Sequence, residues 1–143
     1  MSLAFEEAKK AYNLNEVPVG AIIVKNSEVI SSSYNQVITK NSVVSHAEIN
    51  AILIASQKLK NYRLTDCDMY VTLEPCHMCA KAIVDARLKN VFFGALEPRT
   101  GAIISIDRFF DASHLNHRVN YSHGDMATES AKLLQSFFRS RRV

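Results

Sequence analysis

Long apolar runs are missing from this sequence. The longest, VPVGAIIV at residues 17–24, is interrupted by a proline and a glycine. It is much shorter than the roughly 20 apolar residues that a membrane-spanning helix needs. The first residues, MSLAFEEAKKAY, mix both signs of charge and contain no apolar signal core. We therefore expect a protein that neither spans a membrane nor is secreted, and that is located in the cytoplasm.

Glycine, proline and cysteine are also scarce. The 143 residues include four glycines and three prolines, without a low-complexity tract or an internal repeat. Residues 1–143 are therefore expected to form one domain. Three cysteines, an odd number, fit a reducing compartment better than a disulfide framework. The net charge of +3 is too small to indicate a nucleic-acid partner, but Arg139, Arg141 and Arg142 are concentrated near the C-terminus.

The spacing of apolar residues alternates between helical and extended patterns. Helices are predicted at residues 5–15, 47–59, 76–88 and 126–142. Strands are predicted at residues 19–24, 29–34, 68–74, 90–95 and 117–122, the fourth buried and the last at an edge. The first two should form a hairpin that turns near Asn26 and Ser27. This order predicts a three-layer α/β/α sandwich around a mixed sheet of about five strands.

Two details of the predicted helices can be tested in the structure. Pro75 is expected in the first turn of the helix that carries the cysteines, because a missing N–H costs nothing there. The face of the helix 47–59 that is expected to be buried consists of Ile49, Ile52, Leu53 and Leu59.

Cys76 and Cys79 lie three residues apart, directly behind Pro75. Residues i and i+3 of a helix are roughly 60° apart in projection, so both thiols point the same way from the first turn. Unpaired N–H groups at that end favour thiolates. Sulfur ligands at this spacing suit zinc, which takes four ligands in proteins. His46, in the HAE run at residues 46–48, can supply an imidazole nitrogen as the third.

Glu48 is the candidate proton carrier. It follows His46 by two residues, which is roughly 200° around a regular helix. Both can reach one metal ion only if His46 lies in the non-helical approach to the helix and Glu48 lies in its first turn. Three protein ligands and a nearby carboxylate leave the fourth position for water, as in catalytic zinc sites. Glu48 would accept a proton from that water and deliver it to the substrate.

The same residues allow other interpretations. A Cys-x-x-Cys pair can be a redox dithiol, although that motif has no use for an upstream His-x-Glu. A closed structural zinc site needs a fourth ligand, from Cys67 or His77. Cys67 can equally be a small buried hydrophobe, and His77 is expected to face solvent. A zinc-stabilised RNA-binding module without catalysis is a further alternative.

His-x-Glu combined with Pro-Cys-x-x-Cys is the established signature of zinc deaminases that act on nucleobases. Over nearly its whole length the chain resembles the bacterial tRNA-specific adenosine deaminases of the cytidine deaminase-like superfamily. The segments that carry the resemblance are VPVGAIIV, HAE, NYRL, YVTLEPCHMCAKAI, FFGA, TGA, LNHRV and FFRSRR. The zinc motif identifies only the superfamily, whereas the other segments and their spacing are typical of the tRNA branch.

The resemblance implies an activity and its cofactor. One Zn²⁺ per subunit would be held by His46, Cys76 and Cys79, with Glu48 as the proton shuttle. The implied reaction is hydrolytic deamination of adenosine to inosine at the wobble position of a tRNA anticodon, whose single-stranded loop allows a base to enter a pocket. The implied assembly is a homodimer in which each active site borrows surface from the partner. The alternative within the superfamily is a deaminase of a free base or nucleoside, such as guanine, cytosine or cytidine.

The resemblance also implies contacts with RNA. Asn35 matches the family asparagine that contacts the target base, although by itself it is equally typical of a turn. Glu97 stands where relatives commonly have aspartate, in a loop that meets the RNA backbone. In the C-terminal helix, Phe138 would lie near the loop nucleotides, and Arg139 and Arg141 near phosphates. From the residues alone, a basic helix end is also favoured by the helix dipole.

The segment before His46 departs from the pattern of these relatives. Many of them carry Asp-Pro-Thr-Ala where this chain has SVVS at residues 42–45. Without the proline, a less rigid approach to His46 is expected, although nothing in the metal chemistry requires it.

Overall fold

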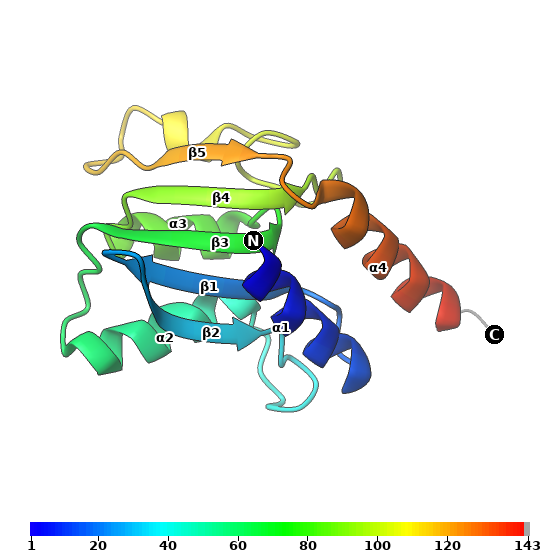
Figure 1. Ribbon diagram of the computed structural model, residues 1–143. Helices are drawn as coiled ribbons and strands as arrows, with labels where there is room; N and C mark the ends of the chain where they lie inside the picture. Colours follow the sequence, from blue (N-terminus) through cyan, green and yellow to red (C-terminus); the bar gives the residue numbers. More distant parts are fainter. Residues whose placement is uncertain (142–143) are drawn as a thin grey trace.

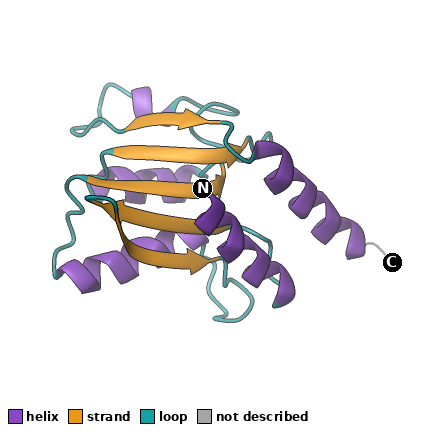
Figure 2. Cartoon of the chain, in the orientation of Figure 1, coloured by secondary structure: helices purple, strands orange, loops and turns teal. Residues whose placement is uncertain are grey.

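A mixed β-sheet with helices on both faces forms the part of the chain that the computed structural model describes, residues 1–141 (Figure 1). Arg142 lies outside these residues. The elements are α1 (Ser2–Asn13), β1 (Gly20–Lys25), β2 (Glu28–Tyr34), α2 (Ala47–Leu59), β3 (Cys67–Leu73), α3 (His77–Asp85), β4 (Asn90–Ala95), η1 (Phe109–Asp111), β5 (Asn120–His123) and α4 (Ala127–Ser140). The helices α1 and α4 cover one face, and α2 and α3 cover the other (Figure 2). The predicted three-layer sandwich is confirmed.

The five strands found within residues 1–141 have the order β2-β1-β3-β4-β5. The strand β1 pairs antiparallel with β2 and β3, whereas β3, β4 and β5 are parallel. Asn26 and Ser27 have φ values of 50° and 63°, as expected of a two-residue turn that matches the twist of a hairpin. The predicted hairpin, the inner position of β4 and the edge position of β5 are therefore confirmed.

This topology gathers four chain segments at one end of the sheet. The strands β2, β3 and β4 end there and β1 begins there, because β1 runs opposite to the other three. The segments before β1 and after β2, β3 and β4 are therefore neighbours in space. The helix α4 begins beside the same end of β4 and extends away from the sheet (Figure 1).

The buried face of α2 differs from the prediction. Leu53 is 54% exposed, so its predicted burial is wrong, and the other three predicted residues are only half-buried. The face against the sheet consists instead of small residues one turn apart, Ala47, Ala51 and Ala55. Their size lets α2 approach β2 so closely that the Ser31 hydroxyl donates a hydrogen bond to the Ala51 carbonyl oxygen at 2.9 Å. Apolar residues lie all around this helix, so their spacing did not identify the inner face.

Within residues 1–141, the structure contains no helix with the length and apolar character to cross a bilayer.

Candidate active site

The approach to α2 has the geometry that the His-x-Glu spacing requires. His46 precedes the first helical residue with extended backbone angles (φ −69°, ψ 155°), and Glu48 lies in the first turn. The side chain of Asn50 holds this approach in place. It accepts a hydrogen bond from the Ser45 hydroxyl at 2.9 Å and donates to the carbonyl oxygens of Tyr34 and Ser45 at 3.0 and 3.2 Å. These bonds fix the backbone before His46 without a proline.

The cysteines come from the start of α3. Cys76 is the capping residue with extended backbone angles, and Cys79 is the third residue of the helix. Pro75 therefore precedes the cap, and the prediction that it lies in the first turn is wrong, because Cys76 occupies the capping position. The Pro75 carbonyl oxygen accepts a hydrogen bond from the Ala102 N–H at 2.9 Å. This bond ties the approach to α3 to the loop after β4.

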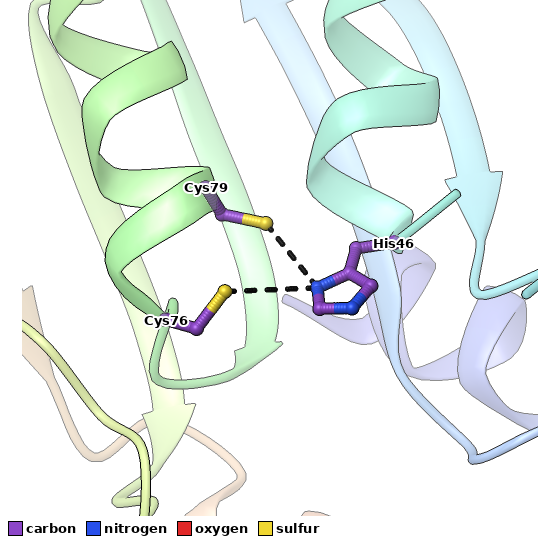
Figure 3. Close-up of side chains that lie close together, drawn as sticks. All are labelled: His46, Cys76 and Cys79. Atoms are coloured by element: carbon purple, nitrogen blue, oxygen red, sulfur yellow. Dashed lines mark hydrogen bonds between the residues drawn. The ribbon is translucent and has the colours of Figure 1, made fainter. Parts of the chain in front are cut away.

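His46, Cys76 and Cys79 converge on one point (Figure 3). The Nδ1 atom of His46 lies 3.7 Å from the Cys76 sulfur and 3.5 Å from the Cys79 sulfur. In a tetrahedral site with Zn–S bonds of about 2.3 Å and Zn–N bonds of about 2.0 Å, sulfur and nitrogen lie about 3.5 Å apart. The donor atoms and their separations therefore fit a metal ion between the three side chains.

The two thiols differ in acidity. A hydrogen bond from Cys79 lowers the pKa of Cys76 well below its ordinary value. The same bond and the burial of Cys79 raise the pKa of Cys79. The hydrogen bond with Cys76 also raises the pKa of His46. Cys76 is therefore readily deprotonated, whereas Cys79 keeps its proton. A metal ion that binds both sulfurs would displace the proton of Cys79.

Glu48 lies beside this group and is only 4% exposed. Burial raises the pKa of its carboxyl above the ordinary value, and the Cys76 charge acts in the same direction. A carboxyl with a raised pKa can both accept and release a proton nearer to neutral pH.

Cys67 and His77 do not join the cluster, which among residues 1–141 consists of His46, Cys76 and Cys79. Cys67 is fully buried in the core at the start of β3, with its sulfur near the Thr65 carbonyl oxygen. The exposed His77 ring pairs with the Asp107 carboxylate at 3.1 Å. The structure therefore brings neither alternative fourth ligand to the site.

A cavity of about 260 Å³ opens over the cluster. Its walls come from the four segments gathered at this end of the sheet: residues 16–19, 35–38, 73–76 and 97–100. Asn35 lies in this wall and donates a hydrogen bond to the Val17 carbonyl oxygen at 3.3 Å. Its Oδ1 atom is buried without a hydrogen-bond partner among residues 1–141. A buried acceptor of this kind is available for an N–H group of a ligand.

The other predicted RNA contacts meet in a groove beside this cavity, between α4 and the loop after β4. We call it the α4 groove, and it is lined by Glu97, Arg99, Leu134, Gln135, Phe138, Arg139 and Arg141. Glu97 lines both the groove and the cavity, so the two spaces are adjacent. Phe138 is 46% exposed. The structure thus brings an exposed aromatic ring and three arginines next to the cavity.

Sequence reasoning missed two buried glutamates at this site, Glu16 and Glu74. The Glu16 carboxylate accepts hydrogen bonds from the N–H of Ile38 at 3.0 Å and from the N–H and hydroxyl of Thr39, both at 2.6 Å. Burial alone would raise the pKa of Glu16, but these hydrogen bonds outweigh it and lower the pKa. Glu16 directly precedes the apolar run VPVG, and Glu74 directly follows the apolar strand that ends in TL. An acidic residue next to an apolar run was the signal that could have identified them.

A mixed sheet that carries a His-Cys-Cys group and a buried glutamate at one end defines the cytidine deaminase-like class of proteins. A family model described as MafB19-like deaminase matches residues 1–142. The tRNA-specific adenosine deaminase of Rickettsia bellii (strain RML369-C) is 44% identical over 144 residues, which cover 99% of each chain. That of Aquifex aeolicus (strain VF5) is 42% identical over 142 residues, which cover 99% of this chain and 93% of the relative.

A solved structure is also similar. It comes from biochemical and structural studies of A-to-I editing by tRNA:A34 deaminases at the wobble position of transfer RNA. It matches with a TM-score of 0.91 and 42% identity, over 93% of this chain and 96% of that chain. The chain matches the MafB19-like deaminase family and belongs to the tRNA-specific adenosine deaminases. The family predicted from the resemblance over nearly the whole chain is confirmed.

Proposed function

We propose that this protein is a zinc-dependent enzyme that deaminates adenosine to inosine at the wobble position of a tRNA anticodon. The observation that carries the proposal is the convergence of His46, Cys76 and Cys79 beneath a cavity, with Glu48 buried beside them. The relatives named above support the choice of adenosine in tRNA.

The proposed metal ligands are Nδ1 of His46 and the sulfurs of Cys76 and Cys79. Bound Zn²⁺ would lower the pKa of water towards neutrality. The three side chains would hold the ion at the cavity, because His46 and Cys76 line its wall. Two thiolates offset the charge of the ion, which makes a neighbouring base useful for removing the proton.

Glu48 is the proposed proton shuttle. Its carboxylate would take one proton from the attacking water and deliver it to the ring nitrogen beside the amine-bearing carbon. Glu48 would then take the second proton from the hydroxyl group now bonded to that carbon and pass it to the amine, which leaves as ammonia. Overall a C–O bond forms, a C–N bond breaks, and water and adenosine become inosine and ammonia. Asn35 Oδ1 would accept a hydrogen bond from the base and orient it above Glu48.

The RNA around the target base is proposed to occupy the α4 groove. Arginine side chains bind phosphates, and an exposed aromatic ring stacks on unpaired bases. Arg99, Arg139 and Arg141 supply the arginines beside the cavity, and Phe138 supplies the ring. A flipped anticodon base in the cavity would leave its neighbours at this groove. The proposed tRNA substrate also gives the proposed cytoplasmic location.

We also propose a single deaminase domain that acts as a homodimer. The family model covers residues 1–142, which supports one domain. Apolar side chains are exposed on the loop after β2 and on α2, and they support a second copy as the partner. They are Ile38, Val43, Val44, Leu53 and Ile54. Because Ile38 also lines the cavity, a partner bound there would border the active site. Sedimentation analysis should give twice the mass of one chain.

The test is turnover of an anticodon stem-loop by the purified protein, compared with free adenosine, guanine, cytosine and cytidine. We expect adenosine in the anticodon to be read as guanosine on sequencing, with one zinc per chain by elemental analysis. Turnover of the free compounds alone would replace the proposal with a small-molecule deaminase. Absence of metal would instead favour a redox dithiol.

Glu48→Ala separates catalysis from binding. We expect the variant to keep its zinc and its affinity for the stem-loop, and to lose inosine formation by at least about 10²-fold, because the proton carrier is gone. Glu48→Gln, which keeps the size of the side chain, should behave in the same way. Undiminished function of both variants would indicate an RNA-binding module without catalysis.

A further inference from the structure

Glu74 lies between the end of β3 and the proline before Cys76, and it is only 3% exposed. Its carboxylate accepts five hydrogen bonds, all from the loop after β4. The donors are the backbone N–H groups of Glu97 (3.0 Å), Ile103 (3.0 Å), Ile104 (2.7 Å) and Ser105 (3.0 Å), and the Ser105 hydroxyl. One side chain therefore satisfies the donors of both ends of this loop.

The loop, residues 97–105, contains neither helix nor strand, so its conformation depends on such contacts. Buried backbone N–H groups need partners, and for Ile103 and Ile104 the partner is Glu74. The loop also packs directly on the carboxylate, because a Cβ atom on Gly101 would lie 2.3 Å from the Glu74 carboxyl group. Only glycine fits at this position without displacing Glu74.

The same loop faces the substrate. Glu97 and Thr100 line the cavity, and Glu97 and Arg99 line the α4 groove. The Glu97 N–H is bound by Glu74, and the Glu97 carboxylate accepts a hydrogen bond from the Arg99 N–H at 2.9 Å. Contacts therefore lead from Glu74 to the residues that would meet RNA.

We propose that Glu74 is a positioning residue. It holds loop 97–105 in one conformation at the wall of the cavity beside the His-Cys-Cys group, and so determines the affinity of the protein for its RNA substrate. The inference rests on the proposed function. The physical basis of this role is that one carboxylate accepts hydrogen bonds from five donors of the loop. Hydrogen bonds to a charged acceptor are stronger than neutral ones, and a glutamine at this position would present one acceptor oxygen and an NH₂ group that faces N–H donors.

Glu74→Gln tests the proposal, with Ser105→Ala as the matched control that removes one donor and keeps the carboxylate. For Glu74→Gln we expect amide exchange at residues 97–105 to rise about tenfold or more, while exchange in β3 and β4 and the zinc content stay unchanged. The KM for the stem-loop should rise about tenfold, with a smaller change in kcat. Ser105→Ala should change both quantities less than about threefold.

Glu74→Asp keeps the charge and shortens the side chain. Its amide exchange at residues 97–105 and its KM should lie between those of the wild type and Glu74→Gln, so this variant tests the proposal if Glu74→Gln does not fold. Wild-type exchange and KM in the folded variant would overturn the proposal. So would loss of metal, or exchange that rises uniformly over the chain, since both indicate a general structural role. If the wild-type protein does not deaminate the stem-loop, the proposed function fails, whereas the exchange pattern and the stem-loop Kd still decide the role of Glu74.

Discussion

Arg141 donates a hydrogen bond from Nη2 to the backbone carbonyl oxygen of Asn15 at 2.8 Å. Its guanidinium also lies over the Phe137 ring, 4.6 Å from the ring centre. The bond ties the end of α4 to the segment before β1, where Glu16 and Val17 line the cavity. Arg141 therefore supports the wall of the α4 groove in addition to its proposed contact with phosphate.

Substitution of the two arginines should separate these roles. Arg139→Ala should weaken stem-loop binding and lower the slope of log K against log salt by about one, as expected for one phosphate contact. Arg141→Ala should in addition lower the unfolding temperature by a few degrees, because the tie to Asn15 is lost. Salt titrations of binding and thermal unfolding measure both effects. Equal unfolding temperatures for the two variants would contradict the structural role of Arg141.

The metal site can be tested by comparing cysteines. Cys76→Ser and Cys79→Ser should each lower the zinc content below one per chain, because a thiolate ligand is lost. Cys67→Ala is the matched control: it removes a thiol from the core, away from the cluster, and should retain zinc. Elemental analysis after dialysis gives the result. Zinc loss in Cys67→Ala alone would show that the ion is held elsewhere.

Glu16 should make stability depend on pH in a defined direction. Its pKa is lowered in the folded protein, so its contribution is fully present above the ordinary value of about 4.5 and is lost as the pH falls through the folded pKa. The free energy of unfolding of the wild-type protein should exceed that of Glu16→Gln by roughly 1–3 kcal/mol at pH 7. The difference should shrink as the pH falls below about 4.5.

Chemical denaturation at several pH values measures this difference. Thr39→Val is the control, since it removes only the hydroxyl donor to Glu16 and should lose less stability at pH 7. A difference between wild type and Glu16→Gln that stays constant down to pH 3 would show that the carboxylate charge is not responsible.

Asn35→Ala should affect the reaction more than RNA binding. The buried Oδ1 atom is proposed to orient the base, whereas the phosphate contacts lie in the α4 groove. We expect kcat/KM for the stem-loop to fall about tenfold or more, with a Kd close to that of the wild type and unchanged zinc. Single-turnover kinetics and equilibrium binding separate the two. A large loss of affinity with normal single-turnover rates would contradict the assignment.

The sequence predicted the elements of the site better than the contacts that hold it. The helix 47–59 and the placement of His46 before it followed from local spacing and from the demand that His46 and Glu48 meet one ion. The inner face of α2 could not be predicted from the spacing, because Leu53 and its neighbours in the sequence are all apolar. Glu16 and Glu74 bind backbone groups that lie 22 to 31 residues away along the chain. Local patterns contain no information about such partners.

Asn50 has a consequence for how this sequence can vary. Within α2 it restrains the backbone before His46 through Ser45 and Tyr34, a restraint that proline provides by stiffening the chain itself. Residues 42–44 therefore need no proline to restrain this backbone as long as Ser45 and Asn50 are kept together. Ser45 and Asn50 should therefore vary together, because exchange of Asn50 alone would remove the three hydrogen bonds that restrain the backbone before His46.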